Sequence, residues 1–161
     1  ILIRQMKYTR LTKEQFEELH QEFASFLASQ NIDKTQWDQL KTENPKIAEQ
    51  ELDIFSDLIW EGALNKIEYL EHFSKNHIFL FHFTENKAQS IVIYCLDSSV
   101  DFLSQEGVIW LSENISSDLV DIKQGQKSFD DKNSGVFSLI QQGALIGNGE
   151  LYNQVKAILE I

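Results

Sequence analysis

The chain has 161 residues, of which 42% are hydrophobic and 11% aromatic, and it contains one proline. This composition predicts a single compact domain and excludes a disordered or linker-rich chain, because apolar burial offsets the entropy lost on ordering. Fourteen basic against 25 acidic residues give a formal net charge of -11, which excludes nucleic acid and membranes from the expected partners because their phosphates repel an acidic surface.

Two helices are predicted first along the chain. Over residues 11–30, aromatic and leucine side chains recur at helical spacing behind a Thr-x-x-Gln capping box that begins at Thr12. A shorter helix follows over residues 35–44, with Asp33 or Thr35 as its cap.

The third predicted helix covers residues 46–62 and carries the most informative pattern in the chain. Asn44 is placed to cap it, and Pro45 suits its first turn. Its apolar face is formed by Ala48, Leu52, Phe55, Leu58, Ile59 and Gly62. The opposite side carries four carboxylates at four-residue spacing, which we call the acidic row: Glu49, Asp53, Asp57 and Glu61. Trp60 falls among these acids.

After Asn65 the hydrophobic period changes from about 3.6 to 2, which predicts an antiparallel meander over residues 66–73, 77–84 and 89–97. A helix is then expected from near Ser104. It should bury Val108, Leu111 and Ile115. A fourth strand is predicted over residues 119–129, at an edge of the sheet, because its lysines and its glycine suit an edge strand.

Two C-terminal helices complete the prediction. Ser134 is expected to cap the first and Gly143 to close it, and residues 149–161 form the second. The glycines of residues 143–149 superficially resemble a phosphate loop, but they join two helices and are predicted to form a helix stop and a turn. The whole order predicts an α+β fold: three N-terminal helices, a meander with an inserted helix and a fourth strand, and two C-terminal helices.

The acidic row provides the leading functional hypothesis. Each like-charge contact between adjacent turns costs about 0.2 to 0.5 kcal/mol, so the fold relieves the repulsion or a partner uses it. The hypothesis is a non-catalytic interaction module in which Glu49, Asp53, Asp57 and Glu61, with Trp60, bind a basic protein partner. The structural alternative is a solvated acidic face whose repulsion is relieved by lysines elsewhere in the fold. A cation on the row is disfavoured, because one helix spreads its ligands over many ångströms.

Three histidines on the first predicted hairpin supply a functional alternative. His72, His77 and His82 could serve a small metal-binding protein or a hydrolase-like enzyme, together with Glu68 or Glu71. Their spacing of five and five is not a zinc signature, and surface or hairpin-capping roles compete with a metal site. No cofactor is otherwise expected, and no nucleophile, zinc or kinase motif is present in the sequence.

The cysteine content and the chain start bear on location. Cys95 is the only cysteine and lies in an apolar strand, which predicts a buried, unreactive thiol and a reducing compartment. No segment approaches the roughly 20 apolar residues of a membrane span, so we expect a cytoplasmic protein. Met6 is a more natural start than Ile1, so residues 1–5 are expected to be an upstream extension. Trp60 and an uncovered edge strand are candidate homodimer contacts.

Three stretches carry a resemblance to a known family: residues 6–23, 48–73 and 137–153. They resemble short, functionally uncharacterised proteins from Bacteroidota, and the likeness covers nearly the whole chain from Met6. The resemblance implies a cytoplasmic bacterial domain. It supplies no catalytic residue.

Overall fold

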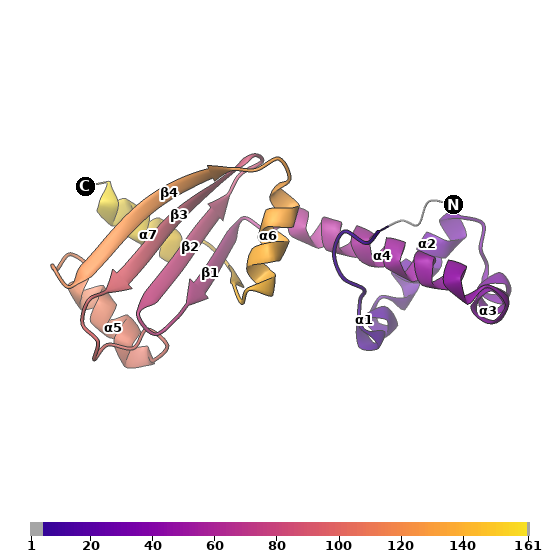
Figure 1. Cartoon of the computed structure of the whole chain (residues 1–161), viewed down its shortest axis with the longest axis horizontal. Coiled ribbons are helices and arrows are strands. Elements are labelled where there is room, and N and C mark those ends of the chain that lie inside the picture. The colour runs from indigo at the N-terminus through magenta and orange to yellow at the C-terminus, as the bar shows by residue number, and fades with distance from the viewer. Residues whose placement is uncertain (1–4, 161) are drawn as a thin grey trace. The chain divides into compact units, whose positions relative to one another are not determined.

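The computed structural model describes residues 5–160, and the prediction that residues 1–5 are an extension therefore lies almost wholly outside the described part. The internal contacts divide the chain into two compact units, residues 1–65 and 66–161, which are described in turn. The predicted α+β class is confirmed, with N-terminal helices followed by an antiparallel sheet and further helices (Figure 1).

The N-terminal unit is helical. Its helices are α1 (Lys13–Glu18), α2 (His20–Ser29), α3 (Lys34–Glu43) and α4 (Pro45–Asn65). The capping box that begins at Thr12 is confirmed, and Asp33 caps α3. The predicted helix over residues 11–30 forms as two helices, because the backbone of Leu19 leaves the helical region at φ -103° and ψ 23°. Hydrogen bonds between helical turns continue on both sides of this residue.

An aromatic cluster holds these helices together. Phe55 of α4 is 3% exposed and lies at its centre. The ring centroids of Phe23 and Phe26 are 5.0 and 5.4 Å from that of Phe55, and the ring of Trp37 meets Phe23 edge-on at 5.2 Å. Such pairs add about 0.5 to 1.5 kcal/mol each beyond their area burial. The predicted apolar face of α4 is buried only in part: Ala48 and Phe55 are buried, Leu52 and Ile59 are half-buried, and Leu58 and Gly62 are exposed.

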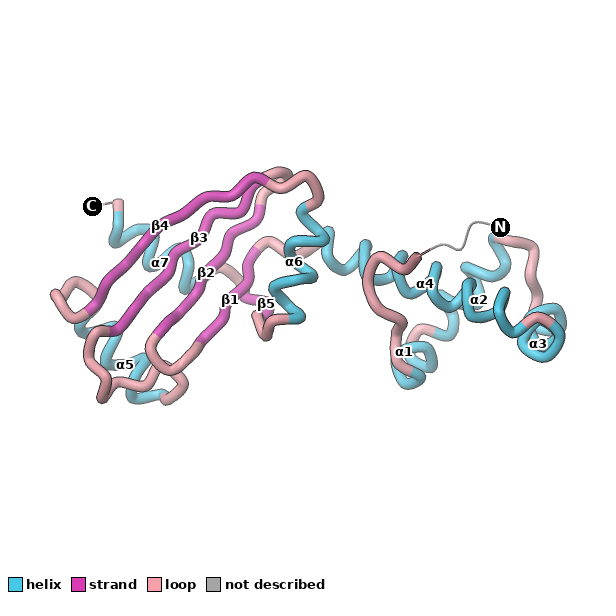
Figure 2. Tube along the Cα trace, in the orientation of Figure 1, coloured by secondary structure: helices cyan, strands magenta, loops and turns pink. Residues whose placement is uncertain are grey.

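The C-terminal unit contains a five-stranded antiparallel sheet in the order β4-β3-β2-β1-β5 (Figure 2). Its strands are β1 (Tyr69–Phe73), β2 (His77–Phe83), β3 (Lys87–Cys95), β4 (Val120–Ser128) and β5 (Leu145–Gly147). Its helices are α5 (Gln105–Asn114), α6 (Lys132–Gln141) and α7 (Glu150–Leu159). The meander and the edge position of the fourth strand are confirmed.

The two faces of the sheet differ. Ile78 and Leu80 of β2 and Ile93 of β3 are fully buried on the first face, in a core shared with Leu111 of α5 and Val155 of α7. Residues that alternate with these strand residues point to the second face. That second face carries Phe79, Phe81, Ser90 and Val92, and it is the face on which the cavity described below lies.

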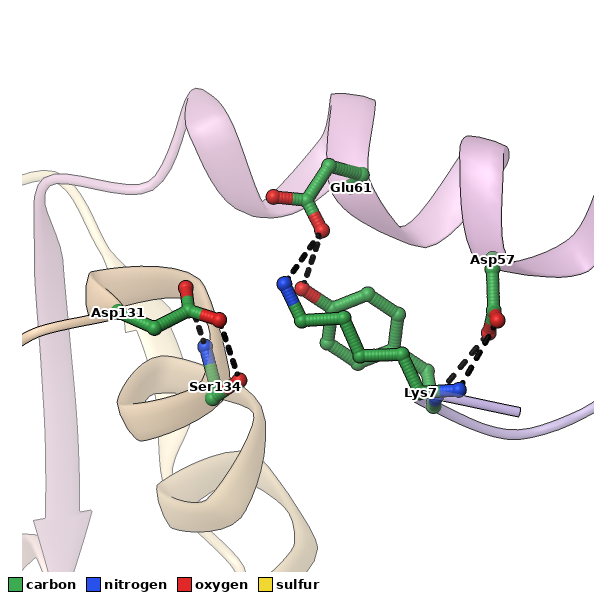
Figure 3. A network of polar contacts seen from close by, with 6 residues as sticks. Lys7, Asp57, Glu61, Asp131 and Ser134 are labelled. Atoms are coloured by element: carbon green, nitrogen blue, oxygen red, sulfur yellow. Dashed lines mark hydrogen bonds and ion pairs between the residues drawn. The ribbon is translucent and has the colours of Figure 1, made fainter. Parts of the chain in front are cut away.

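Four predictions on the C-terminal unit were wrong in detail. The short strand β5 pairs with β1 where a plain turn was expected. Asp131 caps α6 in place of Ser134, whose backbone N–H and hydroxyl both donate to the Asp131 carboxylate, at 3.4 and 2.8 Å (Figure 3). Val108 is 42% exposed, because the first turn of α5 is buried through Gly107. Ile115, the third side chain expected to be buried by α5, is half-buried just beyond its end. Gly143, at φ 109°, closes α6 as expected.

Candidate functional site

The acidic row of α4 contacts a segment of its own chain. Asp57 is 6% exposed, and its carboxylate accepts hydrogen bonds from the backbone N–H groups of Lys7 and Tyr8, at 2.9 and 3.0 Å (Figure 3). A carboxylate held by two backbone donors is a strongly bonded group. The prediction that all four carboxylates lie on the polar side of α4 therefore needs correction, because Asp57 is buried beneath residues 7 and 8.

Two further members of the row are paired with the same segment. The Lys7 ammonium lies 3.3 Å from Glu61, and Arg10 Nε lies 2.6 Å from Asp53. The Tyr8 hydroxyl also donates to Glu61. Burial, and then this hydrogen bond, raise the pKa of Tyr8 to about 12. The side chain of Glu49 is exposed.

These contacts match the structural alternative for the row, in which basic groups from elsewhere in the fold relieve its repulsion. Trp60 is half-buried and its ring lies 6.5 Å from that of Tyr8. A basic partner on this face would have to displace residues 7–10. Its binding to the acidic row stays a prediction.

The structure places the three hairpin histidines on two faces of the sheet. His72 lies opposite Phe79 in the register, and His77 is two residues from Phe79, so both belong to the second face. His82 lies opposite Tyr69, with ring centroids 4.5 Å apart, and belongs to the first face. Among the described residues, no three His, Cys, Asp or Glu side chains are grouped as metal ligands. A metal role for these histidines stays a prediction without a shared site.

Cys95 is buried, as predicted. Its side chain is 2% exposed in the core of the sheet, and the thiol donates a weak hydrogen bond to the Asp97 carbonyl at 3.4 Å. The residues around it in the core are apolar. Nothing in this arrangement activates the sulfur as a nucleophile.

A cavity of about 430 Å³ lies between α6 and the second face of the sheet. Its apolar walls include Phe81 of β2, Ala88 of β3, Leu139 of α6, and Phe129, which lies between β4 and α6. The polar lining residues are Ser90, Gln126, Lys127, Ser138 and Gln142. Pockets for small ligands are typically concave and mostly apolar, with a few polar groups and a volume of about 300 to 1,000 Å³. This cavity falls within that range.

Two glycines shape this cavity. Gly125 lies within β4 opposite Ser90, and a Cβ atom at that position would lie 2.9 Å from the Ser90 hydroxyl. Gly135 lies within α6, where a Cβ atom would lie 2.9 Å from the Phe129 ring. Glycine within a strand often marks a close approach of a ligand or a backbone. Gly125 was predicted only as a residue that suits an edge strand, and these two glycines are the signals of the cavity in the sequence.

The charges at the cavity differ from those of the chain as a whole. Lys127 is the cationic residue of its lining, and the Lys127 Nζ lies 5.3 Å from the centre of the Phe129 ring. None of the described lining residues is Asp, Glu, His or Cys.

Comparison with known proteins adds a family. A family described as "Family of unknown function (DUF6495)" matches residues 6–160, which includes the segment that contacts the acidic row and all residues lining the cavity. No curated protein and no solved structure matches the chain. No helix in the described part of the chain is long and apolar enough to cross a membrane.

Proposed function

We propose that this chain, which belongs to the family of unknown function DUF6495, is a non-catalytic binding protein that holds a small amphipathic anion in the cavity beneath α6. The observation that carries the proposal is a mostly apolar cavity whose described lining residues include one lysine and no carboxylate, in a chain with 25 acidic residues. Acidic side chains elsewhere would repel an anion, so their absence from this lining favours a negatively charged ligand.

The lining favours a ligand with an apolar body and one carboxylate group. Phe81, Phe129 and Leu139 supply contact area for an aromatic or aliphatic chain. Lys127 is exposed, so its ammonium can form an ion pair with the ligand carboxylate at the rim of the cavity. On the same side, the amide of Gln142, at the C-cap of α6, donates to the Ser138 hydroxyl at 3.2 Å, and that hydroxyl can in turn donate to a ligand.

The test is calorimetric titration with 4-phenylbutyrate and with its neutral amide. We expect the anion to bind more tightly than the amide, and Lys127→Gln to weaken its binding by up to about fivefold, the upper end for an exposed ion pair. Lys123→Gln is the matched control, because Lys123 occupies the same face of β4 outside the cavity. Ser138→Trp, at an exposed position of α6, should fill the cavity and abolish binding of both compounds.

Three results would contradict the proposal. They are an absence of heat with both compounds, equal losses for the two lysine variants, and unchanged binding by the Ser138→Trp variant. Circular dichroism of each variant would establish that the fold is retained, so a loss of binding would report on the cavity.

The proposal includes a cytoplasmic, bacterial setting. The buried free thiol of Cys95 supports a reducing compartment, because a lone cysteine forms no internal disulfide. The bacterial assignment rests on the resemblance of residues 6–23, 48–73 and 137–153 to proteins of Bacteroidota. Fractionation of the source cells with an antibody to the protein would test the location.

A further inference from the structure

Exposed apolar side chains concentrate around α5. Ten large hydrophobic residues of the described chain are exposed, and five of them lie within residues 96–119. They are Leu96 (55% exposed), Leu103 (66%), Val108 (42%), Ile109 (51%) and Leu119 (44%). Single exposed apolar residues need no explanation, but a concentration of them marks an interaction site. We call these five residues the α5 patch.

The backbone holds the two ends of the patch in place. Leu103 directly precedes the N-cap Ser104, and Val108 is the fourth residue after that cap. These are the two positions of a hydrophobic staple. Beyond the other end of α5, the Leu96 N–H donates to the Leu119 carbonyl at 2.8 Å, so these two residues lie side by side. Figure 2 shows α5 and its flanking loops together at one end of the sheet.

The first turn of α5 is fixed rigidly against the preceding loop. A Cβ atom on Gly107 would lie only 1.8 Å from the Asp101 carbonyl oxygen, so helix and loop meet where only glycine fits. The Ser104 hydroxyl donates to the same carbonyl at 2.7 Å and accepts from the Gly107 N–H at 3.0 Å. The patch is therefore presented by an ordered surface, which lowers the entropy cost of docking.

The charges around the patch have one sign. Residues 96–119 contain five acidic residues and no lysine or arginine. Three of the acids, Asp97, Asp101 and Glu106, line a cleft of about 350 Å³ together with Trp110. The carboxylate of Asp97 accepts hydrogen bonds from the Ser99 hydroxyl and backbone N–H, which hold its pKa below the ordinary value.

We propose that the α5 patch and its acidic cleft bind a basic amphipathic segment of a protein partner. The apolar side of such a segment would cover the five exposed residues, and a lysine or arginine would enter the cleft over Trp110, between carboxylates. Charge complementarity selects this occupant. An anionic membrane would be repelled by the five acids, and a second copy of the chain would bring the same five acids to the interface.

The experiment measures fluorescence anisotropy of a labelled 18-residue amphipathic peptide of leucine and lysine, at about 0.15 M salt, where long-range attraction is largely screened. The patch variant is Leu103→Ser with Ile109→Ser, and the cleft variant is Glu106→Gln with Asp97→Asn. We expect each pair to weaken binding by about tenfold, as for residues at an interface centre.

Matched controls carry equal changes elsewhere. Leu145→Ser with Ile146→Ser removes two residues that are 69% and 67% exposed on β5, and Glu14→Gln with Glu17→Gln removes two exposed charges from α1. Both controls should bind as the unaltered chain does. If the controls lose as much peptide affinity as the test variants do, binding depends only on overall charge and apolarity, and the proposal is overturned.

Other outcomes also overturn it. These are an absence of binding by the unaltered chain, equal binding of a leucine and glutamate peptide, and equal or better binding to phosphatidylglycerol vesicles. A dimer that dissociates in the Leu103→Ser, Ile109→Ser variant would assign the patch to a second copy instead, and light scattering of both proteins would detect it.

Discussion

Replacement of Asp57 by alanine tests whether the acidic row is part of the fold. The substitution leaves the backbone N–H groups of Lys7 and Tyr8 without their acceptor, at a site where the carboxylate is 6% exposed. Each unsatisfied donor costs about 1 to 3 kcal/mol. Removal of the charge also relieves repulsion from Asp53 and Glu61, one turn away on either side, by about 0.5 to 1 kcal/mol in total. The free energy of unfolding should therefore fall by about 3 kcal/mol, within the range left by these terms.

The assay is urea unfolding together with hydrogen exchange of individual amides by NMR. The Lys7 and Tyr8 amides should lose their protection in the variant, because their hydrogen-bond acceptor is gone. Asp57→Asn keeps one acceptor oxygen and should show about half of the effect, since the second N–H then faces an amide NH₂. Glu49→Ala is the control within the same row, and its exposed side chain predicts a change of less than about 0.5 kcal/mol. Equal stability of the Asp57 and Glu49 variants, or unchanged exchange of the two amides, would refute the reasoning.

Further predictions follow from single contacts. Gly107→Ala should destabilise the C-terminal unit by about 3 kcal/mol, because its Cβ would overlap a backbone oxygen, whereas Gly62→Ala in α4 meets no atom within 4 Å and should stabilise by about 0.5 to 1 kcal/mol in urea unfolding. Since folding raises the pKa of Tyr8 from 10.0 to about 12, its contribution to stability is complete below pH 10 and is lost as pH rises toward 12; Tyr8→Phe should make that decline shallower in pH-dependent melting. The histidine hypothesis predicts metal in the purified protein and a Zn²⁺-induced rise in melting temperature that His72→Ala removes; metal analysis and melting curves check both. A basic partner on the acidic row predicts that a peptide of residues 6–11 competes for it, which a pull-down with added peptide would measure.

Local signals in the sequence were sufficient for most helices and strands. The box at Thr12, the cap at Asp33 and the alternation of β2 act within a few residues, and all three are confirmed. The strand β5 has only three residues, too few to show a period, and it exists because β1 offers it hydrogen-bond partners. Such pairing depends on contacts far apart in the chain and leaves no local pattern.

The candidate sites show the same limit. The spacing of the acidic row correctly indicated charges on one helix, yet the contacts of Asp57 come from residues about 50 positions earlier, which no helical pattern encodes. The cavity depends on β3, β4 and α6 meeting on one side of the sheet, and only the glycines at 125 and 135 hinted at it. The histidines were close in sequence, but strand alternation separates His82 from His72.

The clasp between residues 7–11 and α4 has a consequence for synthesis of the protein on the ribosome. Its hydrogen bonds and ion pairs join residues separated by 43 to 54 positions, so residues 7–11 are translated well before α4 emerges. At about 5 to 20 residues per second, roughly 2 to 11 seconds pass between synthesis of this segment and synthesis of the carboxylates that it contacts. Slow translation through residues 53–61 would prolong that interval, during which residues 7–11 are accessible to a chaperone.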